Sequence, residues 1–293
     1  IANRSRFIRL KGVLLMPLDN LPPLNVAALL RARGLQASKG LGQNFLQDDS
    51  VLANIVAAAG VTLDDDVLEI GPGLGSLTRH LALSARSVTA VELDGSLIPV
   101  LGEVLQPFGN VRVVEGDILN YAPADLMPSD DYLVVANIPY YITSAVFRHL
   151  LENPPRPRRI ALTIQKEVAE RICAAPGDMS LLALSVQVYG NPSIVAHIPA
   201  GAFYPVPKVD SSVIRVDLHP EPLIPVEKLD DFFRFAKAGF SQKRKTLRNS
   251  LSAGLRISPA AAGEMLAQAG IDPMRRAETL SLEEWGRMVL GEP

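Results

Sequence analysis

The residues best placed to do chemistry stand in the stretch VVANIPYYIT, residues 134–143. A hydrophobic run typical of a buried strand ends there at Asn137, and Pro139 and two tyrosines follow almost at once. An exocyclic aromatic amine is a weak nucleophile, because its lone pair is delocalised into the ring. Two acceptors on its hydrogens would draw the nitrogen toward tetrahedral geometry and aim the lone pair at an electrophilic methyl group. We expect the Asn137 side-chain oxygen and the Ile138 carbonyl to be these acceptors.

The residues after Ile138 fit the same chemistry. Pro139 would fix the turn and remove a competing N–H donor, and Tyr140 could stack on an unstacked base. No metal, nucleophilic side chain or strong base is required, because orientation in line with the methyl group supplies most of the effect. The alternative is an ordinary turn at the end of a strand, and we prefer that interpretation only for Tyr141, which we expect to pack at the edge of the core.

A glycine-rich loop, LEIGPGLGSLT at residues 68–78, stands between a predicted strand and a predicted helix. Glycines let the backbone turn tightly and approach a ligand closely. The spacing of Gly71, Gly73 and Gly75 is G-x-G-x-G, which departs from the G-x-G-x-x-G of dinucleotide-binding loops. Glu69 stands two residues before the first glycine and suggests a positively charged ligand group in place of a pyrophosphate.

Acidic residues end the next two predicted strands. Glu92 lies 21 residues after Gly71 and could accept both hydroxyls of an adenosine ribose. Asp117 could receive the adenine amino group, while Ile118 packs on the ring. A loop, a ribose acceptor and an adenine acceptor at successive strand ends predict S-adenosylmethionine as the cofactor in preference to NAD.

These residues need an alternation of strands and helices to bring them together. Strands are predicted at 65–71, 87–94, 111–117, 132–138 and 159–165, with helices at 25–34, 48–60, 75–85, 95–106 and 143–153. Continuous apolar strands alternating with helices indicate a mostly parallel sheet covered on both faces, as in the Rossmann-like folds. Two later runs flanking YPVPKVD predict an antiparallel hairpin at the sheet edge, and residues 180–190 fit a helix or a strand.

Composition sets limits on the class of protein. The 293 residues carry a net charge of −2, contain a single cysteine, Cys173, and offer no run of about 18 apolar residues. The four histidines show no metal-ligand spacing, so we expect no metal, no membrane span and a reducing, cytoplasmic setting. We interpret residues 1–23 as an N-terminal extension, with Met16 as the natural start.

A proline-rich stretch at 219–225 separates this α/β region from a helical remainder. We therefore predict a catalytic domain at 24–219 and a small helical domain at 220–293. The helical part holds four cations within six residues, which suit phosphate contacts and predict salt-sensitive RNA binding, although a solvated helix face is the plain alternative. These cations are Lys243, Arg244, Lys245 and Arg248.

In this order, the motifs resemble those of the ribosomal RNA adenine dimethyltransferases, from about residue 36 to residue 252. The motifs that carry the resemblance are GQNFL (42–46), LEIGPGLGSLT, VELD, GDIL, NIPYY, AFYPVPKVDSSVIR (202–215) and AGFSQKRKTLRNSL (238–251).

The resemblance implies a class I S-adenosylmethionine-dependent methyltransferase fold. It also implies transfer of two methyl groups to N6 of each of two adjacent adenines near the 3′ end of small-subunit (16S) rRNA during ribosome biogenesis, by a monomer. By the same likeness, Phe203 would sandwich the target base with Tyr140. The implied cofactor contacts are Asn44, Leu46, Gly71, Glu92, Asp117 and Asn137.

Three other functions stay open on the sequence. The erythromycin-resistance methyltransferases act on large-subunit rRNA, share the fold and often carry Ile at the position of Ile138. DNA adenine N6-methyltransferases typically carry an acidic residue and two prolines where this chain has Asn137, Ile138 and Pro139. A non-catalytic ribosome assembly factor would keep the fold for RNA docking alone.

Overall fold

The computed structural model describes residues 7–10, 13–17 and 21–291. The chain forms two compact units, one comprising Ile1–Lys166 and Ile194–Val216 and the other Glu167–Ser193 and Asp217–Pro293. Residues 220–293 all fall in the second unit, which also takes two helices from earlier in the chain. The functional division predicted at residues 219 and 220 stays a prediction.

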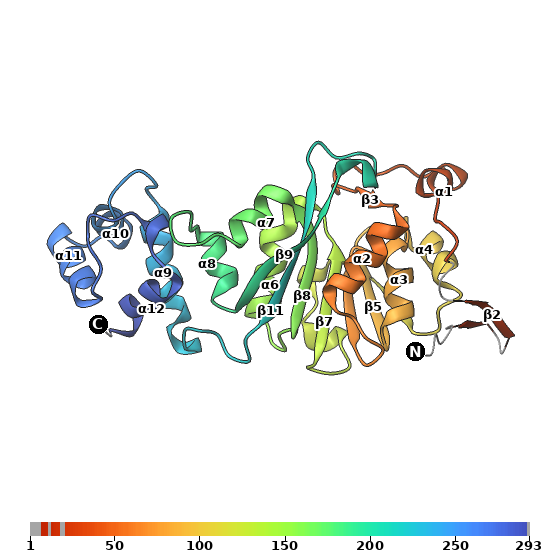
Figure 1. The fold of residues 1–293 in the computed structure, drawn as a ribbon, viewed down its shortest axis with the longest axis horizontal. Helices are drawn as coiled ribbons and strands as arrows, with labels where there is room; N and C mark the ends of the chain where they lie inside the picture. The colour runs from red at the N-terminus through yellow and green to blue at the C-terminus, as the bar shows by residue number, and fades with distance from the viewer. Residues whose placement is uncertain (1–6, 11–12, 18–20, 292–293) are drawn as a thin grey trace, which may run out of the picture. The chain divides into compact units, whose positions relative to one another are not determined.

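A seven-stranded mixed sheet forms the centre of the first unit, in the order β6-β5-β4-β7-β8-β11-β9 (Figure 1). The pairs β4/β5, β5/β6, β4/β7 and β7/β8 are parallel, which confirms the predicted mostly parallel sheet. The strands are β4 (Asp66–Ile70), β5 (Ser87–Glu92), β6 (Val111–Glu115), β7 (Tyr132–Asn137), β8 (Arg159–Gln165), β9 (Gly190–Ile198) and β11 (Ser211–Leu218).

The strand order determines where a ligand can bind. From β4 the chain runs outward to β5 and β6 and then returns to the other side of β4 to form β7. In parallel sheets, ligands bind beyond the carboxyl ends of the strands at such a reversal. The glycine loop leaves β4 and the NIPYY stretch leaves β7, so both segments emerge at this point.

The helices of the first unit cover both faces of the sheet, and their apolar faces explain the continuous hydrophobic strands. All of β4 is buried, as is β7 up to Ala136. Helices α2 and α3 pack on one face, where Leu52, Ile55 and Leu81 meet Val67 and Val135 (Figure 1). The helices are α1 (Val26–Ala32), α2 (Asp49–Ala59), α3 (Ser76–Ser84), α4 (Ile98–Leu105), α5 (Pro123–Leu126) and α6 (Thr143–Glu152).

Local signals place the ends of α2 as predicted. The Asp48 side chain accepts hydrogen bonds from the main-chain N–H groups of Ser50 and Val51, which caps the first turn. Gly60 ends the helix with a φ of 66°, a left-handed conformation that favours glycine. The alternation between strand and helix thus lies within a few residues of its predicted bounds throughout the first unit.

Two short antiparallel pairings lie outside the main sheet. The strand β3 (Phe45–Leu46) pairs with β10 (Phe203–Tyr204), so the GQNFL segment is joined to the segment before β11. The strands β1 (Phe7–Leu10) and β2 (Val13–Pro17) pair with each other within the predicted N-terminal extension, part of which lies outside the described residues.

The second unit is mainly helical, and the ambiguous run at 180–190 forms a helix in it over Leu181–Gln187. Its core is built around Trp285, Phe232 and Leu251, all fully buried, and Trp285 stacks on Phe240 with ring centroids 5.6 Å apart. The helices are α7 (Lys166–Ile172), α8 (Leu181–Gln187), α9 (Leu229–Phe240), α10 (Leu247–Leu255), α11 (Pro259–Gln268) and α12 (Leu282–Leu290).

Candidate functional site

A cavity of about 340 Å³ lies at the carboxyl ends of β4, β5 and β7, within the size range of small-molecule sites. It brings together most of the residues predicted from the sequence. The predicted residues that line it are Asn44, Leu46, Glu69, Gly71, Gly73, Glu92, Asp117, Ile118, Asn137, Ile138, Pro139 and Tyr140.

The glycine loop adopts a conformation that side chains would obstruct. Gly71 and Gly73 have φ angles of 69° and 59°, both in the left-handed region. A Cβ atom on Gly73 would lie 2.8 Å from Cε1 of Phe45, so the loop packs directly against the β3 segment. At Gly71, a Cβ atom would meet no atom within 4 Å, which leaves the main chain open toward the cavity.

Glu92 holds the glycine loop as well as facing the cavity. One of its oxygens accepts the Gly73 N–H at 2.8 Å and the other accepts the Asp94 N–H at 2.8 Å. The side chain is buried, and this burial raises the pKa of the carboxyl group. Each carboxylate oxygen can accept more than one hydrogen bond, so Glu92 keeps capacity for a ligand hydroxyl.

Glu69 is a carboxyl group in an unusual environment for an acidic side chain. It is 1% exposed, and among the described residues its Oε2 has no hydrogen-bond partner. Burial, together with the nearby Glu92 charge, raises the pKa of Glu69 to about 8. The hydroxyl of Ser76, which also lines the cavity, is likewise buried without a partner in the described part of the chain. A buried acceptor left unpaired is costly, so these atoms fit a ligand that donates hydrogen bonds or carries positive charge.

The strand end after β6 provides a shallower wall. Asp117 caps a short 3₁₀ turn by accepting the Leu119 N–H at 3.0 Å, and the buried Ile118 side chain forms the adjoining apolar surface. An apolar side chain beside a carboxylate is suited to a heterocyclic ring that bears an amino group.

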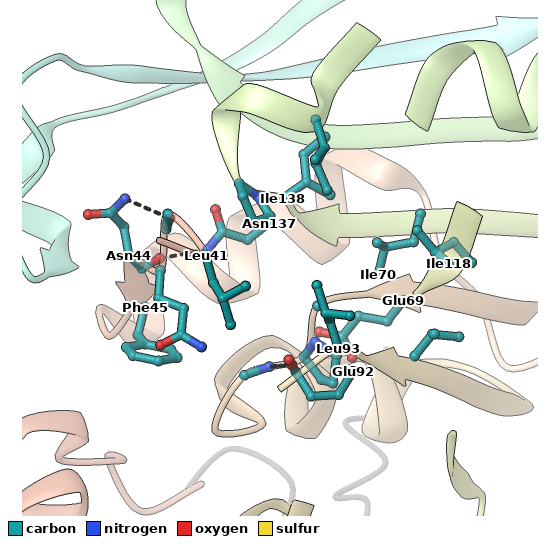
Figure 2. Close-up of a pocket in the computed structure, with 18 of the residues that line it drawn as sticks. Leu41, Asn44, Phe45, Glu69, Ile70, Glu92, Leu93, Ile118, Asn137 and Ile138 are labelled. Atoms are coloured by element: carbon teal, nitrogen blue, oxygen red, sulfur yellow. Dashed lines mark hydrogen bonds between the residues drawn. The ribbon is translucent and has the colours of Figure 1, made fainter. Parts of the chain in front are cut away.

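Asn137 is oriented by a main-chain atom of the GQNFL segment. Its Nδ2 donates to the Asn44 carbonyl oxygen at 3.0 Å, and no described residue donates to its Oδ1 (Figure 2). Asn44 in turn donates from its own side chain to the Gly42 carbonyl oxygen at 3.1 Å. The amide at the end of β7 is therefore fixed with its oxygen available as an acceptor.

The residues after Asn137 form the other side of this wall. Ile138 has a buried side chain, and Pro139 begins the 3₁₀ turn Tyr140–Ile142. The Tyr140 hydroxyl lies 2.8 Å from the Ser211 hydroxyl, so the ring is tied to the start of β11. The ring is half-buried and lines the cavity.

Two aromatic residues lie elsewhere than the sequence indicated. Phe203 is 1% exposed and packs in the core with Leu46 and Val213, and its side chain is not among those that line the cavity. The cause is the pairing of Phe203 with Leu46 in the two short strands. Tyr141, expected to pack at the core edge, is 64% exposed and lines the cavity.

Several lining residues were not predicted from the sequence, and for Gln43 the reason is that its contacts are not local. Gln43 bridges the Ser38 N–H at 2.7 Å and Asp94 at 2.7 Å, which ties the GQNFL segment to the strand end that holds Glu92. The spacing of Ser76 right after Gly75 could have indicated a ligand contact at the helix start. Further lining residues are Leu41, Phe45, Leu93 and Ile142.

The predicted basic segment lies in the second unit, between α9 and α10. Lys243, Arg244 and Lys245 are exposed, whereas Arg248 is half-buried on α10 and its Nε has no partner among the described residues. Within the described ranges, no group of three or more His, Cys, Asp or Glu side chains could hold a metal ion. No helix there is both long enough and apolar enough to span a membrane.

Comparison with known proteins identifies the fold and the family. A family model described as ribosomal RNA adenine dimethylase matches residues 34–290. A protein of Dehalococcoides mccartyi strain CBDB1 named ribosomal RNA small subunit methyltransferase A is 49% identical over 87% of this chain and 88% of its own. A protein of the same name from Alkaliphilus oremlandii is 42% identical over 90% of this chain and 94% of its own.

Two solved structures share the architecture. The 23S rRNA methyltransferase ErmE is 32% identical, with a TM-score of 0.68 over 85% of this chain and 99% of its own. A dimethyladenosine transferase from Plasmodium falciparum is 25% identical, with a TM-score of 0.70 over 84% of this chain and 96% of its own. The sheet order and the cavity define a class I S-adenosylmethionine-dependent methyltransferase fold. The chain belongs to the ribosomal RNA adenine dimethylase family.

Proposed function

We propose that the protein transfers methyl groups from S-adenosylmethionine to N6 of two adjacent adenines near the 3′ end of small-subunit rRNA. The observation that carries the proposal is the fixed amide of Asn137, whose oxygen is available at the end of β7 beside the cofactor cavity. The small-subunit substrate is supported by the names of relatives that are 49% and 42% identical.

The cavity residues fit the proposed cofactor by their chemistry. Glu69 Oε2 and the Ser76 hydroxyl are buried without a partner among the described residues and would accept hydrogen bonds from an ammonium group, and Glu92 offers acceptors to ribose hydroxyls. Asp117 and Ile118 suit an adenine ring with its amino group. When bound, S-adenosylmethionine supplies an electrophilic methyl group.

The chain's own contribution is to hold the target amine. Asn137 Oδ1 and the Ile138 carbonyl would accept the two amine hydrogens, while Tyr140 supports the base by stacking. Removing free rotation and solvent from the reacting amine lowers the activation barrier without an acid or a metal. The amine proton can leave after transfer. The exposed cations at 243–245 would contact phosphates of the RNA, and residues 220–293 would serve as an RNA-binding domain.

Incubation with labelled S-adenosylmethionine and small ribosomal subunits that lack the modification tests the proposal. We expect label on two adjacent adenines near the 3′ end of the rRNA, which mass mapping of nuclease fragments would locate. Duplex DNA and large subunits serve as competing substrates. Label on large-subunit rRNA alone would favour the activity named for the 32% identical neighbour, and binding without transfer would favour an assembly factor.

The proposal also implies a monomeric, cytoplasmic enzyme that acts on immature small subunits. Light scattering of the purified chain should give a mass near 31.6 kDa. A mass twice as large would contradict the monomer without affecting the proposed reaction.

A further inference from the structure

The NIPYY stretch presents two consecutive tyrosines in different surroundings. Tyr140 is half-buried and tied through its hydroxyl to Ser211. Tyr141 lines the same cavity but is 64% exposed, so most of its surface faces solvent at the mouth. An exposed aromatic side chain beside a binding cavity offers an open ring face on which a ligand ring can stack.

The Tyr141 ring has a firm support on one side. A Cβ atom on Gly42 would lie 3.2 Å from the ring atom Cε1, so the ring rests against the main chain of the GQNFL segment. Pro139 adjoins the same spot, since its Cβ lies 3.4 Å from the position that a Cβ atom on Gly42 would take. A ring held on one side loses little conformational freedom when a second ring stacks on the other side.

The place of Tyr141 determines which part of an RNA it can meet. The target base must enter the cavity to bring its amine to Asn137 and must leave its own stack to do so. Tyr141 is too exposed to enclose that base, and Phe203, which was expected to complete the sandwich, is in the core. When the target base is inside the cavity, the neighbouring nucleotide is the part of the RNA that lies at the mouth.

The charge near Tyr141 also suits an RNA strand. Lys39 is exposed and belongs to the turn that supports the ring, because the Gly42 N–H donates to the Lys39 carbonyl oxygen at 3.1 Å. Single-stranded nucleic acids bind to aromatic side chains that stack on the bases and to cations that attract the phosphates, and this turn offers one of each.

We propose that Tyr141 is a positioning residue on which the base next to the target adenine stacks, with Lys39 directed to the connecting phosphate. The inference rests on the proposed function and adds a second nucleotide to its substrate site. Tyr141 does not touch the reacting atoms. It holds the strand so that one base stays outside while its neighbour occupies the cavity.

Steady-state kinetics of the full-length protein on unmodified small subunits test the proposal. Tyr141→Ala should raise the KM for subunits about tenfold and change kcat by less than about twofold, since stacking contributes on this order per base. Tyr141→Phe keeps the ring and should restore the KM to within about twofold of the wild type. The affinity for S-adenosylmethionine should be the same in all variants.

Leu63→Ala is the matched control. Leu63 is 48% exposed but precedes the amino end of β4, whereas the cavity lies at the carboxyl ends of the strands. Its truncation should therefore leave KM and kcat unchanged. An unchanged KM in Tyr141→Ala, or equal losses in Tyr141→Ala and Tyr141→Phe, would overturn the stacking role.

A fluorescent base gives a readout that does not depend on catalysis. With 2-aminopurine placed next to the target adenine in a substrate RNA, wild type and Tyr141→Phe should quench its fluorescence on binding, and Tyr141→Ala should not. Equal quenching by all three would contradict the proposal. If the wild type instead labels large-subunit rRNA, the small-subunit assignment fails and the same comparison on that RNA decides the role of Tyr141. If it labels no RNA, both proposals fail.

Discussion

At the scale of single residues, Asn137 depends on an atom 93 positions away in the chain, because its Nδ2 donates to the Asn44 carbonyl oxygen. We expect Asn137→Ala to lower kcat for methyl transfer about 10²- to 10³-fold, the usual loss when one preorganised polar contact to a reacting group is removed. Binding of ribosomal subunits should persist. Normal transfer by this variant would contradict the mechanism.

The variant Asn137→Asp separates orientation from acceptor capacity. Aspartate keeps an oxygen acceptor but cannot donate to the Asn44 carbonyl, so the carboxylate would be repelled from its anchor. We expect its kcat to fall as far as that of Asn137→Ala. Activity close to the wild type would show that the Asn44 contact is dispensable.

From the environment of Glu69 we predict that binding of the cofactor releases a proton. Because burial raises the pKa of Glu69 to about 8, the carboxyl is mostly protonated at pH 7 without ligand, and an ammonium group would bind its ionised form. Binding should release close to one proton at pH 7, and cofactor affinity should rise with pH and level off above about 8. Titration calorimetry in buffers of different ionisation enthalpy measures this release. Glu69→Gln should abolish it.

The raised pKa of Glu69 also makes the stability of the ligand-free fold depend on pH. A carboxyl whose folded pKa is raised stabilises the fold below its unfolded pKa, and this contribution is lost as pH rises through about 8. The ligand-free protein should therefore unfold more easily in urea at pH 9 than at pH 5 through this site. The loss of stability between pH 5 and pH 9 should be smaller in Glu69→Gln than in the wild type. An equal loss in both proteins would mean that other titratable groups cause it.

Because strand ends and turns are local features, single-residue patterns in the sequence singled out acids and glycines that line the cavity, namely Glu69, Gly71, Gly73, Glu92 and Asp117. Their roles in binding a cofactor stay predictions. The environments of Phe203 and Tyr141 were reversed. Phe203 is buried by a two-residue pairing with β3, a contact across more than 150 residues that leaves no periodic signal. Tyr141 is exposed because a 3₁₀ turn follows Pro139 in place of a continued strand.

At the scale of elements, α9 and α10 approach closely at a glycine. A Cβ atom on Gly254 would lie 2.6 Å from the Cα atom of Ala238, a backbone atom that cannot rotate away. We expect Gly254→Ala to lower the free energy of unfolding of the second unit by about 1–3 kcal/mol, as overpacking does. Trp285 is the single tryptophan and lies in this unit, so its fluorescence in urea reports the change.

Gly263→Ala on α11 is the matched control for this prediction. A Cβ atom there would meet only the Cδ atom of Arg248, at an ordinary 3.8 Å. Alanine is also the better helix former by about 0.5–1 kcal/mol, so this variant should be neutral or slightly more stable. Equal destabilisation by both substitutions would rule out the close helix contact as the cause.

The connection between α9 and α10 predicts salt dependence of RNA binding. Replacing Lys243, Arg244 and Lys245 by alanine should weaken subunit binding and lower the slope of log affinity against log salt by about 2 to 3. Filter binding between low and moderate salt measures the slope. The charge-preserving variant Lys243→Arg, Arg244→Lys, Lys245→Arg should keep it. Equal slopes in the alanine variant and the wild type would contradict phosphate contacts.

Element types and bounds followed from the sequence where hydrophobic periodicity was strong. The five parallel strands and most helices of the first unit lie within a few residues of their predicted bounds. Residues 180–190 were ambiguous because a short, largely apolar run fits a buried helix and a buried strand equally. In the structure the run forms the helix α8, which buries Ala183, Leu184 and Val186. This helix ends at Gln187, and β9 begins at Gly190.

At the scale of the whole molecule, the two units should respond differently to the cofactor. All the cavity residues belong to the first unit, so saturating S-adenosylmethionine should slow amide hydrogen exchange there and leave α9–α12 unchanged. Mass spectrometry of exchanged peptides measures this. Equal protection of both units would mean that they open cooperatively. The segments expected to slow most are 41–46, 69–77, 116–119 and 137–142.

The division into units could not be predicted from composition, because the proline-rich stretch at 219–225 marks only one of the crossings between them. The chain crosses between units near residues 166, 193 and 216, twice within the strands β9 and β11. Within a continuous strand the alternation of side chains does not change where the chain passes from one unit to the other, so the sequence gives no signal there.

The hydrogen bond from Asn137 to the Asn44 carbonyl oxygen has a thermodynamic consequence for the order of events. The main chain that orients the proposed substrate acceptor lines the cavity proposed for the cofactor, so a ligand that fixes this segment would also prepare the substrate side. The two ligands are then heterotropic partners, and linkage requires the coupling to be reciprocal. Whatever factor the cofactor adds to RNA affinity, bound RNA must add to cofactor affinity, and an enzyme on its ribosomal subunit would keep its methyl donor longer than a free one.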